Sequence, residues 1–225
     1  MNILIVSATV LEVKPLLDFL EIKDPTIGIN QSKKALNNHD IKVLITGVGM
    51  VNTALMMGKH MNSTIDLAMN AGVCGAFNKN RSLGEVLLVT KDIISEMGAE
   101  NDSDFLTFEQ LKLPGQTKFE LNNLPKCLVN SKLQTAAGIT VNTVHGNNDT
   151  INKVLNLFSP DVESMEGAAL HYVGSLTKTP FIQIRAISNY VGERNKAKWK
   201  IKESIEQLEA YVLTYLATLE NSLNK

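Results

Sequence analysis

Two glutamates lie where carboxylates could carry out acid–base chemistry. Glu12 follows the apolar run NILIVSA, and Glu166 lies among the small and apolar residues of VESMEGAA. A buried carboxylate needs a hydrogen-bonding partner or a ligand, which makes Glu166 a candidate functional residue. Glu12 is a candidate because open α/β sheets bind ligands at the carboxyl ends of their strands. The alternative for Glu12 is a first-turn carboxylate that the helix macrodipole favours.

Three further polar residues are candidates for the same site. Arg185 lies inside the apolar segment FIQIRAI, and Asn189 follows it. A buried guanidinium needs a partner, so Arg185 either serves the site or forms a structural ion pair, for example with Glu166. Asn189 either contacts a ligand or caps a turn at the end of a strand. His145, in VHGN, is either a site residue or an ordinary loop histidine.

Two glycine-containing segments, TGVG and AGVCG, follow apolar runs and are expected to form tight turns at the carboxyl ends of strands. A dinucleotide-binding fingerprint would need a third glycine where Asn52 stands, so that motif is excluded. The residues of these segments that we expect near the ligand are Gly47, Gly49, Val73, Cys74 and Gly75.

The elements that must position these residues alternate along the chain. Apolar runs predict strands, and apolar residues at helical spacing predict helices. The alternation indicates an α/β fold with a mainly parallel sheet in one domain, residues 1–225. The predicted strands are 2–8, 41–46, 66–71, 85–90, 138–143 and 181–187, and the predicted helices are 11–20, 50–61, 149–158, 165–176 and 198–221. Residues 96–135 are rich in turn signals and are expected to form an insertion over a site or at an interface.

The composition is that of an ordinary globular chain, with 225 residues, 44% hydrophobic residues and a formal net charge of −1. No run approaches the ~18 apolar residues of a membrane span, and the start does not resemble a signal peptide. Cys74 and Cys127 have no CxxC partner, so we expect reduced thiols in a cytoplasmic protein. Arginines occur only at positions 81, 185 and 194, which leaves no basic stripe for nucleic acid. The sequence contains no Cys/His cluster of the kind that binds metal, so no metal site is expected.

Several segments, taken in order, resemble the nucleoside phosphorylase and nucleosidase superfamily. They are SATVLEVKP, TGVGMVNTA, NAGVCGAF and VESMEGAA, with RAISN placing Asn189 23 positions after Glu166. VESMEGAA and IRAISNYVGERNKAKW are most similar to the futalosine hydrolases of the alternative menaquinone pathway, ahead of the 5′-methylthioadenosine/S-adenosylhomocysteine nucleosidases. The resemblance implies a three-layer α/β/α sandwich around a mixed, partly barrel-like sheet. It also implies a homodimer that cleaves a purine N-glycosidic bond without metal or organic cofactor.

The resemblance also implies roles for individual residues. Glu166 would bind the ribose hydroxyls, and Met165 would pack on the sugar. Glu12 would hold and deprotonate a water, Arg185 would help to position that water and the carboxylates, and Asn189 would contact the leaving base. The remaining expected contacts are the pocket floor at residues 73–75 and the base-stacking region at residues 144–147, with Val144 and His145.

Two choices follow for the reaction. Glu12 would place a negative charge where a phosphate nucleophile would sit, so water is favoured. Asn189 offers one acceptor and two donor hydrogens, which suits a protonated N7 and a 6-oxo group and mismatches adenine. The expected activity is hydrolysis of a 6-oxopurine nucleoside, with futalosine first and inosine still open.

Two alternative functions stay open at this point. The chain could be a methylthioadenosine/S-adenosylhomocysteine nucleosidase with an altered base contact, or a non-catalytic nucleoside-binding protein on the same fold. The benzoate of futalosine would need a cation or donor, for which the candidates are Lys91, His145 and Arg194. In a dimer, residues 96–115 could complete the neighbour's pocket.

Overall fold

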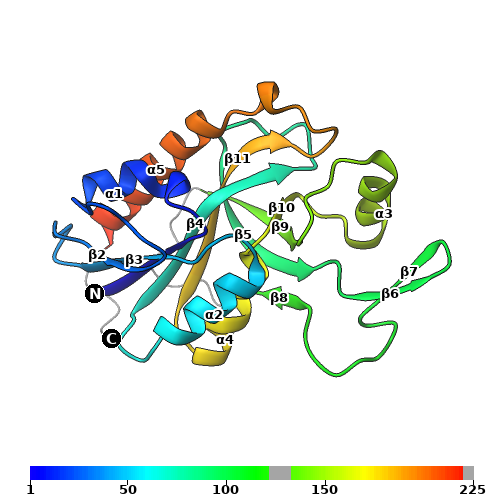
Figure 1. Ribbon diagram of the computed structural model, residues 1–225, viewed down its shortest axis with the longest axis horizontal. Coiled ribbons are helices and arrows are strands. Elements are labelled where there is room, and N and C mark those ends of the chain that lie inside the picture. Colours follow the sequence, from blue (N-terminus) through cyan, green and yellow to red (C-terminus); the bar gives the residue numbers. More distant parts are fainter. Residues whose placement is uncertain (122–132, 220–225) are drawn as a thin grey trace.

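The computed structural model describes residues 1–121 and 133–219 of the chain (Figure 1). Strands and helices alternate over most of this length, as the apolar patterning predicts. The strands are β1 (Asn2–Ser7), β2 (Gly28–Gln31), β3 (Asp40–Ile45), β4 (Leu67–Ala76), β5 (Val86–Ile94), β6 (Gly98–Asn101), β7 (Asp104–Thr107), β8 (Lys118–Glu120), β9 (Gln134–Thr140), β10 (Val162–Ser164) and β11 (Phe181–Tyr190). The α-helices are α1 (Lys14–Phe19), α2 (Met50–His60), α3 (Asn148–Phe158), α4 (Gly167–Thr177) and α5 (Ile201–Thr218).

The central sheet has nine strands in the order β10-β9-β5-β11-β4-β1-β3-β2, with β8 paired to β5. Because β10 also pairs with β4, one part of the sheet closes on itself into a small barrel. The sheet is mixed, since β2–β3, β11–β5, β10–β4 and β5–β8 are antiparallel. The pairings β1–β3, β1–β4, β10–β9, β11–β4 and β5–β9 are parallel, so the expectation of a mainly parallel sheet is confirmed. The sequence did not predict β2, β8 and β10, because they span only three or four residues and carry no clear pattern.

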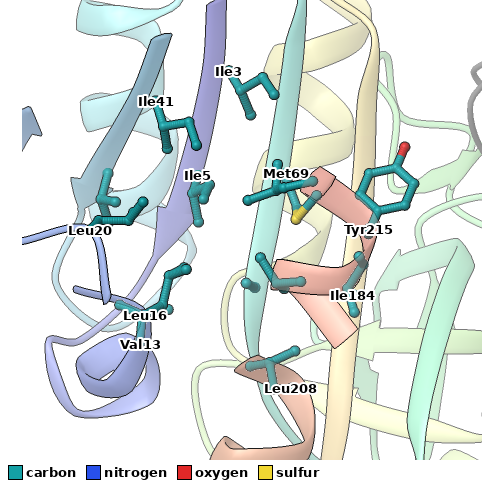
Figure 2. Close-up of a cluster of buried hydrophobic side chains, with 14 of the residues drawn as sticks. Ile3, Ile5, Val13, Leu16, Leu20, Ile41, Met69, Ile184, Leu208 and Tyr215 are labelled. Carbon is teal, nitrogen blue, oxygen red and sulfur yellow. The ribbon is translucent and has the colours of Figure 1, made fainter. Parts of the chain in front are cut away.

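Helices cover both faces of the sheet, which confirms the three-layer α/β/α architecture with a mixed, partly barrel-like sheet (Figure 1). Helices α1 and α5 pack on one face over a core that includes Ile5, Leu16 and Leu208, shown in Figure 2. Helices α2 and α4 cover the other face over a core that includes Met57 and Leu170. Full burial of one such aliphatic side chain contributes about 1.5–3 kcal/mol, so both layers hold the sheet firmly.

Strand β4 continues through the segment that the sequence predicts to be a turn. AGVCG is part of the strand up to Ala76, and Gly72 pairs with Arg185 of β11. A side chain at Gly72 is excluded because a Cβ there would lie 2.2 Å from Nη1 of Arg185 and 2.8 Å from Oε1 of Glu12. The glycine therefore leaves room for charged groups above the strand rather than making a turn.

Strand β11 likewise extends past its predicted end. Ser188 and Asn189 lie inside the strand. The register of its pairing with β4 shifts between Ile187 and Asn189. At the other end of the chain, the first predicted helix begins as a 3₁₀ turn, Leu11–Val13, before α1.

The turn-rich segment 96–135 contains a β6–β7 hairpin that projects from the body of the protein, followed by β8 (Figure 1). None of residues 96–121 lines the cavity described below, so this part does not cover the site within one chain. Residues 122–132 of the segment, with Cys127, lie outside the described residues. In the described part of the chain, no helix combines the length and apolar character needed to cross a membrane.

Candidate active site

The predicted site residues meet at one cavity of about 280 Å³ near the closed part of the sheet. Nine of the twelve expected residues line it, and they are Glu12, Val73, Cys74, Gly75, Val144, His145, Met165, Glu166 and Asn189. Arg185, Gly47 and Gly49 do not line it. Arg185 and Gly49 nevertheless contact its carboxylates directly.

Glu12 is held by backbone and side-chain donors on both oxygens. Thr9 donates to Oε2 from its amide at 3.1 Å and its hydroxyl at 3.0 Å, while the amide of Val73 donates to Oε1 at 3.1 Å. The amide of Glu12 in turn donates to the Thr9 hydroxyl, as in a capping box. Glu12 thus lies in the first turn of the 3₁₀ helix and also lines the cavity. Burial raises its pKa above 4.5, and the charge of Glu166 adds to this rise.

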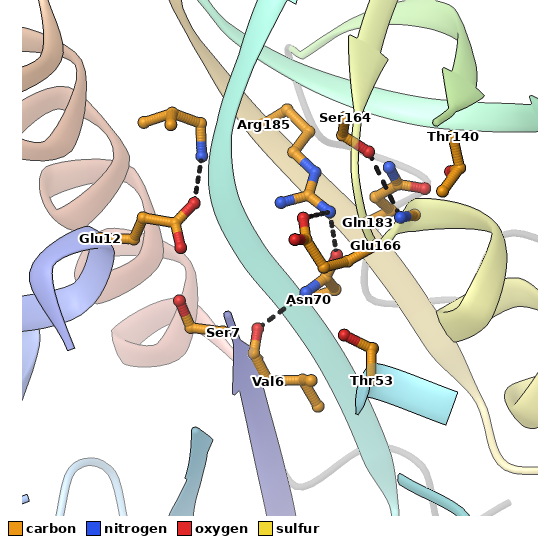
Figure 3. A network of polar contacts seen from close by, with 12 residues as sticks. Val6, Ser7, Glu12, Thr53, Asn70, Thr140, Ser164, Glu166, Gln183 and Arg185 are labelled. Carbon is orange, nitrogen blue, oxygen red and sulfur yellow. Dashed lines mark hydrogen bonds and ion pairs between the residues drawn. The ribbon is translucent and has the colours of Figure 1, made fainter. Parts of the chain in front are cut away.

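Arg185 is fully buried, and its guanidinium lies beside the carboxylate of Glu166 (Figure 3). Its Nη2 lies 3.8 Å from Oε2 of Glu166 and donates to Oδ1 of Asn70 at 2.5 Å. Asn70 itself donates to the carbonyl of Val6 on the neighbouring strand. The predicted Glu166–Arg185 ion pair therefore exists, and it belongs to the site. Asn70 was missed by the sequence analysis, and the signal for it was a polar residue inside the strand DLAMN.

Glu166 occupies the N-cap position of α4 without capping it. Its Oε1 instead accepts a 3.0 Å hydrogen bond from the amide of Gly49, whose φ of +99° favours glycine. The first helical amides are satisfied elsewhere. Ser164 accepts from the amide of Gly167, and Thr140 accepts from that of Ala168 at 2.7 Å. This arrangement leaves the Glu166 carboxylate facing the cavity.

A buried polar network lies behind α4 and was not anticipated from the sequence. The carboxyl of Asp92 accepts from the Thr140 hydroxyl at 2.7 Å and from the Gln183 amide at 3.1 Å. Gln183 also pairs with His171 at 3.0 Å. Gly167 fits against this network because a Cβ there would lie 2.1 Å from Asp92. Burial raises the pKa of Asp92 to about 6 and lowers the pKa of His171 to about 4.

The opposite end of the cavity is built around Asn189. Its Oδ1 accepts from the Ser188 hydroxyl at 2.8 Å, and its Nδ2 donates to the carbonyl of Tyr190 at 3.2 Å. Beside it, Nδ1 of His145 lies 2.6 Å from Oε2 of Glu163. Glu163 was also missed, because the sequence VESMEGAA draws attention to Glu166. We call Glu12, Arg185 and Glu166 the carboxylate end, and Asn189, His145 and Glu163 the amide end.

The guanidinium of Arg194 lies over the Trp199 ring, 5.1 Å from its centroid, and both residues line the cavity. Lys91 is paired with Glu120 at 3.0 Å and does not line it. His145 and Trp199 carry the aromatic rings found among the described lining residues. Cys74 is a buried wall residue, and burial raises the pKa of its thiol to about 12, so it is no nucleophile.

The arrangement suits reactions that develop positive charge on a bound substrate. Two carboxylates line the cavity, and the Arg185 guanidinium pairs with Glu166 and acts on Glu12 through its charge. Preorganised charge of this kind stabilises cationic transition states, and a held carboxylate can take a proton from water. The described residues contain no group of three His, Cys, Asp or Glu side chains placed to hold a metal ion.

The chain is similar to several known proteins. The family model of the phosphorylase superfamily matches residues 2–217. The chain is 28% identical to futalosine hydrolase of Thermus thermophilus over 77% of this chain and 80% of that protein. It is 27% identical to aminodeoxyfutalosine nucleosidase of Campylobacter jejuni, over 86% and 88% of the two chains.

Solved structures share the fold. A futalosine hydrolase mutant of Helicobacter pylori superposes with a TM-score of 0.81 at 19% identity, over 97% of this chain and 100% of that one. A mutant of the methylthioadenosine nucleosidase from Helicobacter pylori, with 5′-methylthioadenosine in its active site, gives a TM-score of 0.80 at 20% identity, over 97% and 99% of the two chains. The match of the family model over nearly the whole chain shows that the protein belongs to the phosphorylase superfamily.

Proposed function

We propose that the protein hydrolyses the N-glycosidic bond of a 6-oxopurine nucleoside. The substrate is futalosine, which would yield hypoxanthine and dehypoxanthine futalosine in menaquinone biosynthesis. The observation that carries the proposal is the pair of cavity carboxylates, Glu12 and Glu166, set against the neutral amide of Asn189. The curated relatives named futalosine hydrolase, from Thermus thermophilus and Streptomyces coelicolor, support the choice of nucleoside.

At the carboxylate end, Glu166 binds the ribose hydroxyls and Met165 packs on the sugar. Glu12 holds and deprotonates the attacking water, because both its oxygens are already fixed by donors. Arg185 keeps the two carboxylates in place and does not itself reach the cavity. As the glycosidic bond lengthens, positive charge on the sugar is stabilised by both glutamates.

Water is the nucleophile because the carboxylate end offers no cradle for a phosphate. Arg185 is buried and engaged with Asn70 and Glu166. Arg194 is the one Lys or Arg among the described lining residues, and it lies over Trp199. An anion placed between Glu12 and Glu166 would meet like charges in a poorly solvated space.

At the amide end, Asn189 contacts the leaving base. Each of its polar atoms keeps capacity for a ligand beyond the Ser188 and Tyr190 contacts. The carbonyl accepts from a protonated N7, and the NH₂ donates to a 6-oxo group. Residues Val144 and His145 border the base.

Arg194 with Trp199 takes the benzoate of futalosine. Of the three cations or donors considered for this role, Lys91 is held away by Glu120 and His145 is held by Glu163. An arginine flat on an indole still offers its edge to a carboxylate. This leaves Arg194 as the residue for the far end of the substrate.

The second candidate is a methylthioadenosine/S-adenosylhomocysteine nucleosidase, which relatives of that name from Bacillus species favour at 25–26% identity. One assay separates the two. Purified protein is incubated in phosphate-free buffer with futalosine, inosine or methylthioadenosine, and released bases are separated by chromatography. Hypoxanthine from futalosine supports the proposal, and adenine as the main product overturns it. No release from any substrate would favour a non-catalytic binding protein.

The protein also acts as a cytoplasmic homodimer in this proposal. Helices α2 and α4 pack together and expose apolar side chains, including Val51, Leu55 and Leu176. A second copy on this face would cover them and bring residues 96–115 toward the neighbouring cavity. Sedimentation of the wild type against Leu55→Lys tests this, since the variant should sediment as a monomer.

A further inference from the structure

The pair formed by His145 and Glu163 has an unusual distribution of hydrogen bonds. Both oxygens of Glu163 accept from the same residue, one from the His145 amide at 3.1 Å and the other paired with Nδ1 at 2.6 Å. Glu163 is only 4% exposed, although both residues line the cavity. The loop and the ring of His145 are thus fixed by one carboxylate.

This pair is adjacent to Asn189. A Cβ on Gly75 would lie 3.3 Å from Nδ2 of Asn189 and 3.5 Å from Cγ of Glu163, so both side chains lie against the same glycine. If Asn189 contacts N7 and the 6-substituent of a purine, the next ring atom along that edge is N1. A neighbour of Asn189 on this edge can reach N1, and the His145–Glu163 pair is such a neighbour.

The hydrogen bonds also define the tautomer. A carboxylate can only accept, so Nδ1 of His145 carries the hydrogen that points to Glu163. In the neutral imidazole, Nε2 is then an acceptor. Among the described residues, Nε2 has no hydrogen-bond partner and is left for a ligand.

We infer that Nε2 of His145, held as an acceptor by Glu163, reads N1 of the base and selects 6-oxopurines. A 6-oxopurine carries N1–H, which donates to Nε2, whereas N1 of a 6-aminopurine has a lone pair that opposes it. This inference rests on the proposed function, because it requires a purine nucleoside in the cavity. It adds a second specificity contact, independent of Asn189.

The test uses Glu163→Gln, which reverses the tautomer. The glutamine oxygen still accepts from the His145 amide, and its NH₂ now donates to Nδ1, so Nε2 must carry the hydrogen. The measured quantity is the ratio of kcat/KM for futalosine to that for aminodeoxyfutalosine, which differ only in the 6-substituent. We expect this ratio to fall roughly 10-fold to 100-fold, with an absolute gain on the 6-amino substrate, as an acceptor becomes a donor.

Two further variants keep the test decisive. Glu120→Gln makes the same chemical change at a surface ion pair and should leave the ratio unchanged. His145→Phe keeps a ring without nitrogens, so the ratio should fall without a gain on the 6-amino substrate. A folded Glu163→Gln protein with an unchanged ratio, or His145→Phe with a wild-type ratio, overturns the inference. Wild-type protein that is inactive on both substrates would instead overturn the proposed function.

Discussion

At the carboxylate end of the cavity, Glu12, Glu166 and Arg185 bring three formal charges into the interior, whereas at the amide end Asn189 presents a neutral group beside the His145–Glu163 pair. The charges at the first end are fixed by backbone amides of Val73 and Gly49, which come from different elements. At the second end, Asn189 is fixed by its sequence neighbours Ser188 and Tyr190, and His145 is fixed by Glu163 of β10.

The comparison indicates that the carboxylate end governs the rate of the reaction and the amide end governs the choice of base. Rigid charge at the carboxylate end stabilises charge that develops in the transition state, whatever the base. Hydrogen-bond patterns at the amide end discriminate between bases, because an unmatched buried polar group is costly. Variants at the carboxylate end should lower turnover for all substrates. Variants at the amide end should change which substrate the enzyme prefers.

The largest effect is expected for Glu12→Gln. The amide can still accept from Thr9 or Val73 but cannot take a proton from water, so turnover should fall ~10²–10⁴-fold. Substrate binding should be retained, as measured by calorimetry with futalosine. Unchanged turnover would remove Glu12 from the role of base.

The wild type offers a matching pH test of the same residue. Burial raises the pKa of Glu12 above 4.5, and the base works only when it is deprotonated. Turnover should therefore decline, as pH falls, at a pH above the usual range of a glutamate. A pH–rate profile that stays flat down to pH 4.5 would contradict the assignment.

Asp92 supports the carboxylate end from behind, and its protonation should appear in stability. Its pKa is 3.8 ordinarily and about 6 in the folded protein, so the folded state binds more protons between these values. Asp92 should then lower the free energy of unfolding by up to about 3 kcal/mol as pH rises from about 4 to about 6. His171, whose pKa is lowered to about 4, raises it over the same range, so the contribution of Asp92 is the difference between the wild type and Asp92→Asn. Urea unfolding at several pH values measures this. An Asp92→Asn variant with the same slope as the wild type would contradict it.

Asn189→Asp changes the amide end alone. The carboxylate has no NH₂ to donate to a 6-oxo group, so transition-state stabilisation for futalosine should weaken by about 1–3 kcal/mol. This corresponds to a fall in kcat/KM of roughly 5-fold to 150-fold. The preference for aminodeoxyfutalosine over futalosine should rise. An equal loss on both substrates would show that the two ends are not separate in function.

The smallest effect is expected for Thr140→Val, which removes the acceptor for the Ala168 amide and the donor to Asp92. The start of α4 should loosen by about 0.5–2 kcal/mol, as for a lost cap. If the loss acts through Glu166, kcat/KM should fall several-fold for both bases, with Thr140→Ser close to wild type. A change in the base preference would contradict the assignment to the carboxylate end.

The sequence predicted the carboxylate end better than the amide end. A glutamate among small residues and an arginine inside an apolar strand are conspicuous because charges need partners when buried. Glu163 and Thr140 gave no such signal, since their partners come from distant segments that only the fold brings together. The same limit applies to the sheet. Long apolar strands were found, but the short strand β10, which closes the barrel, was not.

The central claim is that water, activated at the carboxylate end, displaces a 6-oxopurine. The most direct test is futalosine hydrolysis in phosphate-free buffer made with ¹⁸O-water, followed by mass spectrometry of the products. The account predicts free hypoxanthine and one ¹⁸O atom in the sugar product. Absence of hypoxanthine, or cleavage only when phosphate is added and a sugar phosphate forms, would contradict it.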